Sequence, residues 1–210
     1  MYRPALEKAA DTCNIMLSGD MISAAIEILL KYNTRVNYRE HEVTSDVIFS
    51  EILGIWKLQA DLDSLKTEFY SFFKANAEPF PETIETLKNL KAADIKIGIL
   101  TDVAYGMDNK FSLQDIELLS DYIDIALTSI DVGYRKPNKA GFLKLLNYFD
   151  VLPNEMIFVG DEEKDIIGAN DLGIVSVLIN RSGSVKAFKQ DYTLESLGEI
   201  FAVIEKAAHN

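Results

Sequence analysis

Four short apolar runs in the second half of the chain constrain its fold more than any other feature. They are almost continuously apolar, are separated by segments of helical periodicity, and comprise Ile95–Thr101, Ile123–Ser129, Met156–Gly160 and Ile174–Asn180. Strands that alternate with helices form parallel sheets, and unbroken apolar strands are typical of sheets buried on both sides. We therefore predict an α/β fold, a parallel sheet with helices on both faces.

The first half of the chain has a different rhythm, because its apolar residues recur at helical spacing. Ile22, Ala25 and Leu29 are one example. Steps of three and four residues place such side chains on one face of a helix, and no stretch of this half has the character of a strand. We therefore predict two domains, a helical one at residues 1–78 and an α/β one at residues 79–210.

The charge of the chain restricts its partners. It carries 21 basic and 33 acidic residues, a formal net charge of −12. Nucleic acids and anionic membrane surfaces attract clustered lysine and arginine, so neither is expected as the main partner. A small phosphorylated substrate is not excluded, because one metal ion and one lysine can neutralise its charge.

The remaining composition fits a cytoplasmic protein. No apolar run approaches the roughly 18 residues that a membrane helix needs, and the N-terminal residues lack the apolar stretch of a secretory signal. The single cysteine, Cys13, cannot form an internal disulfide, which agrees with a reducing compartment. We expect a cytoplasmic location with no membrane partner.

Candidate reactive residues follow three of the predicted strands. They are Thr101, Asp102, Lys136, Asp161 and Asp165. Each has an ordinary alternative role, as a helix cap, a surface lysine or an acidic residue at a helix start. Because parallel strands present their carboxyl ends at one edge of a sheet, we expect these residues to converge there. A hydroxyl, an ammonium group and the carboxylate pair of Asp161 and Asp165 suit phosphoryl chemistry, in which these two carboxylates hold Mg²⁺.

Three segments resemble motifs of the haloacid dehalogenase-like hydrolases. "ILTD", "GYRKPN" followed by a phenylalanine, and "VGDEEKDIIGAN" are similar to the second, third and fourth motifs of that family, across residues 79–180. The resemblance implies a Rossmann-like α/β core with an N-terminal helical cap. It also implies a Mg²⁺-dependent phosphatase that acts on small phosphorylated metabolites.

The resemblance further implies a role for each residue. Thr101, with Asp102 beside it, would bind the phosphate of the substrate. Lys136 would stabilise the nucleophile and the phosphoryl group. Asp161 would be a direct ligand of Mg²⁺, and Asp165 would orient the waters of the metal or the lysine.

The first motif of the family has no clear match. That motif is an apolar strand ending in Asp-x-Asp-x-Thr, whose first aspartate attacks phosphorus and whose second is the general acid and base. The sequence Asp61–Asp63 lies in a helical context, and the nearest approximation is Cys13–Leu17 followed by Ser18-Gly19-Asp20. We expect a chain that begins just after this motif and is weakly active or inactive. A non-catalytic binding protein of the same fold is the alternative.

The missing strand would lie in the middle of the predicted sheet, between the strands at residues 156–160 and 95–101. Its place could be filled in three ways: by residues 13–17 as a substitute strand, by a segment of a second copy in a homodimer, or by direct pairing of the two flanking strands. We favour the first, because that run is apolar and close to the N-terminus. The sequence leaves the substrate and the oligomeric state open.

Overall fold

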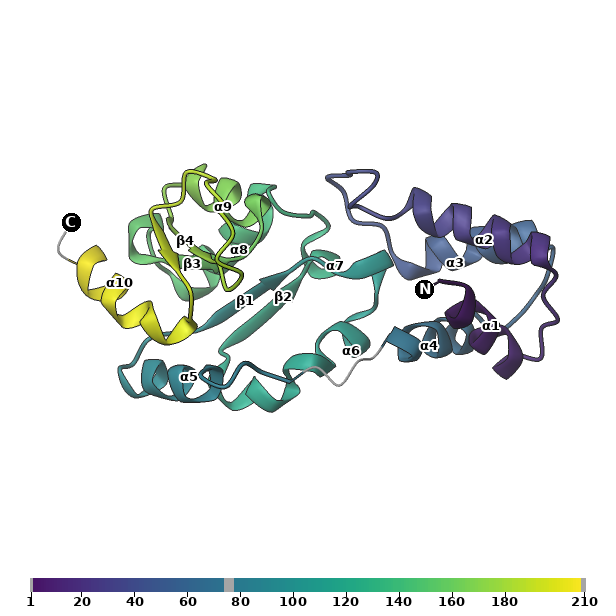
Figure 1. Cartoon of the computed structure of the whole chain (residues 1–210), viewed down its shortest axis with the longest axis horizontal. Coiled ribbons are helices and arrows are strands. Elements are labelled where there is room, and N and C mark those ends of the chain that lie inside the picture. The colour runs from purple at the N-terminus through teal and green to yellow at the C-terminus, as the bar shows by residue number, and fades with distance from the viewer. Residues whose placement is uncertain (1, 74–77, 209–210) are drawn as a thin grey trace. The chain divides into compact units, whose positions relative to one another are not determined.

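The computed structural model describes residues 2–73 and 78–208, which form two compact units (Figure 1). The first unit comprises residues 1–78 and Val103–Glu117, and the second comprises Pro79–Asp102 and Leu118–Asn210. The sequence division at residue 78 placed residues 103–117 in the α/β domain. In the structure this segment packs with the helical unit, so the chain leaves the second unit after Asp102 and returns to it at Leu118.

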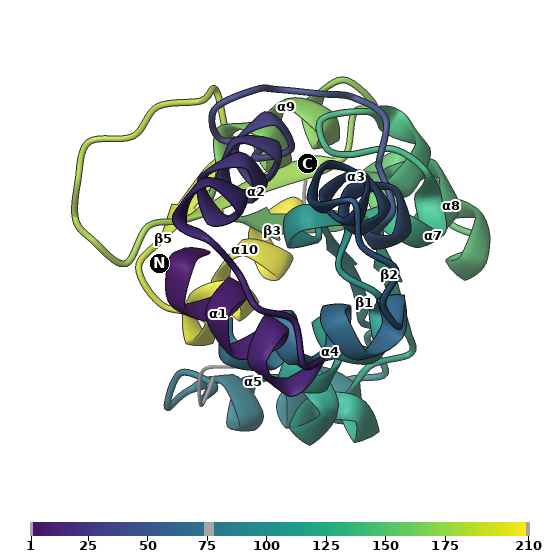
Figure 2. The ribbon, with the colours of Figure 1, turned by 90° about the vertical axis from the view of Figure 1, so that its right-hand side faces the viewer.

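The first unit is helical, as predicted (Figure 2). Its helices are α1 (Tyr2–Thr12), α2 (Gly19–Lys31), α3 (Ser45–Trp56) and α4 (Leu62–Phe73). Their apolar faces share one core in which Leu6, Leu29 and Leu65 are fully buried. Phe49 and Phe69 meet edge to face in this core, with ring centroids 5.1 Å apart.

The segment after Asp102 is attached to the helical unit by polar contacts. It contains the short helices η1 (Ala104–Gly106), α6 (Asn109–Ser112) and the start of η2 (Gln114–Tyr122). The hydroxyl of Tyr70 donates to the carbonyl of Tyr105 at 2.8 Å, and the buried Lys66 ammonium lies 3.2 Å from Asp108. Burial alone would lower the pKa of Lys66, but hydrogen bonds to Asp46, Asp63 and Asp108 outweigh it and raise the pKa.

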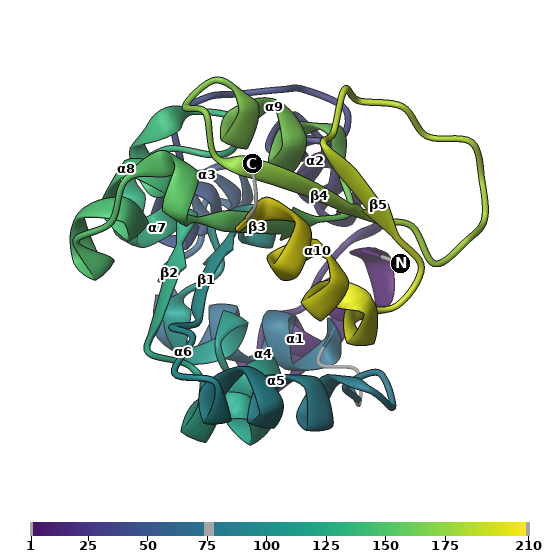
Figure 3. The same ribbon diagram turned by 90° about the vertical axis from the view of Figure 1, so that its left-hand side faces the viewer.

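The second unit holds two parallel sheets in the part of the chain that the structure describes (Figure 3). One pairs β1 (Gly98–Thr101) with β2 (Ile125–Thr128), and the other has the order β3 (Ile157–Gly160), β4 (Val175–Ile179), β5 (Tyr192–Leu194). The four predicted strands are all present. Strand β5 was not predicted, because three residues in a polar context give too short a pattern to recognise.

Helices cover both faces of these strands, which confirms the predicted α/β architecture. They are α5 (Thr83–Ala92), α7 (Ser129–Val132), α8 (Lys139–Phe149), α9 (Glu163–Asn170) and α10 (Ile200–Ala207), with the short η3 (Pro153–Glu155) and η4 (Leu197–Glu199). One core joins Leu100 and Phe158 to Phe142 of α8. The opposite core joins Val177 of β4 to Ile200 of α10 and to α5. In Figure 3, α9 and α10 lie on opposite sides of the β3-β4-β5 sheet.

Strands β1 and β3 are not hydrogen-bonded to each other, and residues 13–17 do not form a strand. Two expectations for the central position, the favoured substitute strand and direct pairing, are therefore wrong. The Ser18 hydroxyl accepts the N–H of Met21 and begins α2, so this serine is a helix cap. Ile15 and Leu17 are partly buried against the core of the helical unit, and the removal of their apolar side chains from water stabilises this position.

Within the described residues no helix combines the length and the apolar character that a bilayer crossing requires.

Candidate active site

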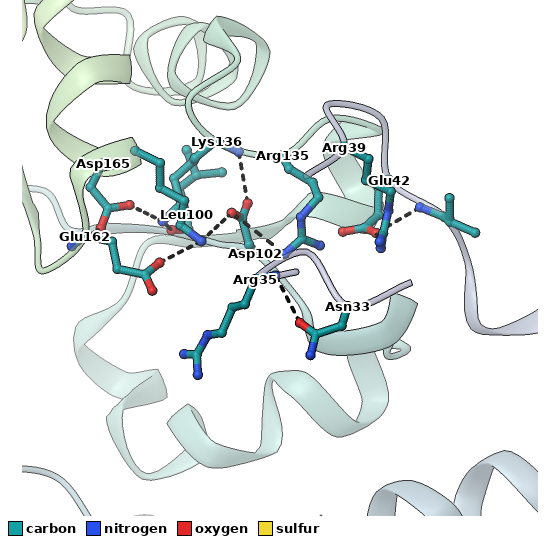
Figure 4. A network of polar contacts seen from close by, with 12 residues as sticks. Asn33, Arg35, Arg39, Glu42, Leu100, Asp102, Arg135, Lys136, Glu162 and Asp165 are labelled. Atoms are coloured by element: carbon teal, nitrogen blue, oxygen red, sulfur yellow. Dashed lines mark hydrogen bonds and ion pairs between the residues drawn. The ribbon is translucent and has the colours of Figure 1, made fainter. Parts of the chain in front are cut away.

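The side chain of Lys136 contacts the end of β1 and the first turn of α9 (Figure 4). Its ammonium group lies 2.7 Å from Oδ1 of Asp165 and donates to the carbonyl of Leu100 at 3.0 Å. The side chains of Lys136 and Asp165 are 11% and 5% exposed, so water screens their attraction only weakly. The structure therefore brings together two of the residues that the sequence singled out.

Asp165 is fixed through its second oxygen as well. Oδ2 accepts the backbone N–H groups of Asp161 and Glu162 at 3.2 and 3.1 Å, so the first turn of α9 folds back on the end of β3. Charged acceptors form stronger hydrogen bonds than neutral ones, and these bonds hold the carboxylate at one place. Both oxygens of Asp165 are therefore engaged within the protein, one of them with Lys136.

Asp161 has a different environment. It follows the last residue of β3, is exposed, and its carboxylate has no hydrogen bond or ion pair in the described part of the chain. Lys186 donates to its backbone carbonyl at 3.2 Å. A carboxylate with uncommitted oxygens at a strand end fits a hard cation such as Mg²⁺.

The protein offers only part of a magnesium coordination shell. Among the described residues no group of three or more His, Cys, Asp or Glu is arranged to hold a metal. Mg²⁺ prefers about six oxygen ligands and keeps several waters, so a single carboxylate suits a site that is completed by water and by substrate oxygens. Asp161 can therefore serve as one ligand of the ion. Asp165, whose two oxygens are engaged within the protein, would support the site.

Asp102 is buried among cations. Its Oδ1 accepts the backbone N–H of Lys136 at 3.1 Å, and its Oδ2 lies 2.9 Å from Nζ of Lys164 and 3.9 Å from Nη2 of Arg135. The side chain is 4% exposed. The carboxylate thus has internal contacts through both of its oxygens, and the substrate contact expected from the sequence stays a prediction.

Lys164 and Arg135 were not singled out by the sequence analysis. Their positions in the sequence could have indicated them, because Lys164 directly precedes Asp165 and Arg135 directly precedes Lys136. Burial alone would lower the pKa of Lys164, but hydrogen bonds to Glu162 and Asp102 outweigh it and raise the pKa. Lys164 is therefore a cation throughout the physiological range.

Thr101 ends β1 and lies opposite Thr128 in the ladder. It is half-buried, and its hydroxyl makes no hydrogen bond within the described residues. The hydroxyl is therefore available at the carboxyl end of β1, next to the residue whose carboxylate contacts Lys136.

Comparison with known proteins shows the family of the chain. Residues 19–179 match the sequence model of the family described as haloacid dehalogenase-like hydrolase. The match covers most of the chain and includes Thr101, Lys136, Asp161 and Asp165. The protein belongs to the haloacid dehalogenase-like hydrolases.

Curated relatives carry phosphatase names. The chain is 30% identical to a glyceraldehyde 3-phosphate phosphatase of Methanocaldococcus jannaschii over 175 residues, 80% of this chain and 73% of that protein. It is 29% identical to a ribulose-1,5-bisphosphate 5-phosphatase of Halopiger xanaduensis, across 67% of this chain and 62% of that one. It is 27% identical to the pyrophosphatase PpaX of Bacillus mycoides, across 61% of each. The chain thus spans less than two thirds of the latter two relatives.

Solved structures share the fold. A HAD phosphatase from Thermococcus onnurineus superposes with a TM-score of 0.64 at 24% identity, over 97% of this chain and 87% of that one. A 2-haloacid dehalogenase from Pseudomonas syringae superposes with a TM-score of 0.66 at 20% identity, over 98% and 93%. These likenesses establish the architecture of the chain.

Proposed function

We propose that this protein is a Mg²⁺-dependent phosphatase of small phosphorylated metabolites. The observation that carries the proposal is the position of the Lys136 ammonium group, held by Asp165 and the Leu100 carbonyl at the ends of β3–α9 and β1. A fixed cation beside an available hydroxyl and an available carboxylate is suited to stabilising the charge of a phosphoryl group. The phosphatase names of the curated relatives support the same substrate class.

Each residue has a separate task in this proposal. The Thr101 hydroxyl donates to a phosphate oxygen, and the Lys136 ammonium group neutralises phosphoryl charge. Asp165 keeps that ammonium group in place through the 2.7 Å ion pair. Asp161 is the residue that would hold Mg²⁺, and the bound ion would supply further electrostatic stabilisation of phosphoryl oxygens.

The 210 residues contain no recognisable nucleophile for this reaction. The sequence has no apolar strand ending in Asp-x-Asp-x-Thr, and the Asp61–Asp63 stretch lies at the start of α4 in the helical unit. Ser18 is occupied as the cap of α2. We propose that hydrolysis requires an added strand of the family's first-motif type.

Among the described residues, strand β1 has no strand partner on the side away from β2, and an added strand can use this edge. The carbonyl of Ile97 accepts the N–H of Asp124, which leads into β2. Because successive residues of a strand direct their backbone groups to alternate sides, Gly98 and Leu100 direct theirs away from β2. The Leu100 carbonyl on this free side is the one that accepts Lys136.

Strand β3 likewise has no strand partner on the side away from β4 in the part of the chain that the structure describes. The carbonyl of Met156 accepts the N–H of Val175, so the backbone groups of Ile157 and Val159 are directed away from β4. Strands β1 and β3 contribute to the same apolar core through Leu100 and Phe158. An added parallel strand between them would satisfy both edges and would end beside Lys136.

The test compares the chain as it stands with a form extended at its N-terminus by an apolar strand ending in Asp-x-Asp-x-Thr. We expect the extended form to hydrolyse a generic aryl phosphate ester with Mg²⁺, and the parent chain to show little or no turnover. Lys136→Met in the extended form should abolish the gain. Robust Mg²⁺-dependent hydrolysis by the parent chain, lost on Asp20→Ala, would contradict the need for an added strand.

A non-catalytic phosphate-binding protein is the second candidate, and the absence of the nucleophile motif from the sequence favours it. Phosphate binding that Lys136→Met abolishes, together with no turnover by the extended form, would support this candidate over the phosphatase.

A further inference from the structure

A buried carboxylate beside a phosphate-binding lysine presents an electrostatic problem. Asp102 directly follows Thr101, and an uncompensated negative charge there would repel a bound phosphate. Removing a charge from water without a partner is also strongly unfavourable. The protein must therefore neutralise Asp102 from within.

The neutralising partner nearest to Asp102 is Lys164. Its Nζ lies 2.9 Å from Asp102 Oδ2 and 2.7 Å from Glu162 Oε2, while Arg135 Nη2 lies 3.9 Å from the same Asp102 oxygen. The formal charges of these two carboxylates and two cations cancel. Lys136 and Asp165 form a second neutral pair beside them.

Lys136 is held both at its backbone and at the tip of its side chain. Asp102 accepts its backbone N–H, and Asp165 and the Leu100 carbonyl hold its ammonium group. The backbone contact fixes the point from which the side chain extends, and the ammonium contacts fix its tip. The placement of the ammonium group thus depends on Asp102, whose carboxylate binds the backbone N–H of Lys136 and not its ammonium group.

We infer that Asp102 and Lys164 are positioning residues that form an internal ion pair. Asp102 fixes the backbone of Lys136, and Lys164 neutralises the charge of Asp102 so that it does not repel a bound phosphate. This inference deepens the proposed function and rests on it for the role of Lys136. Lys164 acts through Asp102 and does not contact the substrate.

A double-mutant cycle separates this role from direct phosphate binding by Lys164. The variants are Asp102→Asn, Lys164→Met and the combination, with binding of inorganic phosphate measured by calorimetry without added Mg²⁺. Asparagine keeps an oxygen that can accept the Lys136 N–H. We expect Lys164→Met to weaken phosphate binding roughly tenfold, because Asp102 then has only the more distant Arg135 as a compensating cation. Asp102→Asn should bind at least as tightly as the parent.

The double variant decides between the two roles. It should recover to within about threefold of the parent, since both charges are gone and Lys136 is unchanged. Lys96→Met controls for the loss of one positive charge, because Lys96 precedes β1 by two residues and its side chain is 61% exposed. A double variant as weak as Lys164→Met would overturn the inference, because it would make Lys164 a direct phosphate ligand.

Hydrogen exchange of the Lys136 amide tests the positioning without any ligand. We expect Asp102→Ala to accelerate exchange at this amide at least tenfold, and Asp102→Asn to preserve most of its protection. Unchanged protection in Asp102→Ala would refute the inference. Absence of phosphate binding by the parent would instead count against the proposed function, and the exchange result would stand by itself.

Discussion

A Cβ atom on Gly160 would lie 2.3 Å from Cβ of Asp165 and 2.5 Å from its Oδ2. The two residues approach this closely because Asp165 accepts the N–H groups of Asp161 and Glu162 and so lies directly over the end of β3. Gly160 is therefore required by the contact between the strand and the carboxylate that holds Lys136.

Gly160→Ala should displace Asp165 and lower the free energy of unfolding by about 1–3 kcal/mol, as expected for an overpacked contact. Urea unfolding measures the change. Gly54→Ala is the matched control, since Gly54 is in α3 with nothing within 4 Å of the added atom, and alanine should raise helix stability by about 0.5–1 kcal/mol. Equal effects of the two substitutions would show that the Gly160 contact is not restrictive.

The Lys136–Asp165 pair should contribute more to stability than an exposed pair at the same distance. Lys136→Met leaves a buried carboxylate with only its backbone partners, at a cost of about 1–3 kcal/mol. Lys31 and Glu51 are also 2.7 Å apart but 58% and 33% exposed, so water screens their attraction and Lys31→Met should cost less than Lys136→Met. Chemical unfolding of both variants gives the comparison, and a larger loss from Lys31→Met would contradict it.

Mg²⁺ binding should depend on Asp161. We expect weak, saturable binding by the parent chain and its loss in Asp161→Ala, because the uncommitted carboxylate supplies the one protein ligand that we identify. Calorimetric titration measures both. Glu163→Ala removes an exposed carboxylate two residues away and should leave the titration unchanged. The same response in parent and Asp161→Ala would remove Asp161 from the site.

Acid should weaken the junction between β1 and β2 through Asp124. The backbone N–H of Ile97 and the ammonium group of Lys91 lower the pKa of Asp124, which accepts from them at 2.8 and 2.9 Å. A lowered pKa in the folded state stabilises the protein above the unfolded pKa of about 4, and this contribution is lost as the pH falls through the folded value.

Asp124→Asn should therefore be less stable than the parent near neutral pH, with a difference that shrinks as the pH falls below about 4. Urea unfolding across this range measures it. A difference that grows with acidity would contradict the sign of the effect.

The parts of the fold that were predicted correctly depend on local patterns. Strand and helix periodicity are properties of neighbouring residues, so the four strands from Gly98 to Ile179 and the helices of the first unit could be identified directly. Strand β5 is three residues long, too short for a periodic signal. The segment Val103–Glu117 joins the helical unit through contacts of Tyr105 and Asp108 with distant residues, which no local pattern records.

The candidate site divides in the same way. By itself the sequence determined which side chains follow the strands, because strand ends are local features and parallel strands share one direction. Only the tertiary structure decided which of those side chains are buried and which groups they contact. Asp102 and Lys136 are 34 residues apart in the chain, yet a hydrogen bond joins them, and folding also buries Asp102 beside Lys164. The role of a charged group depends on its burial and on the charges around it, and both are set by residues that folding brings together from separate parts of the chain.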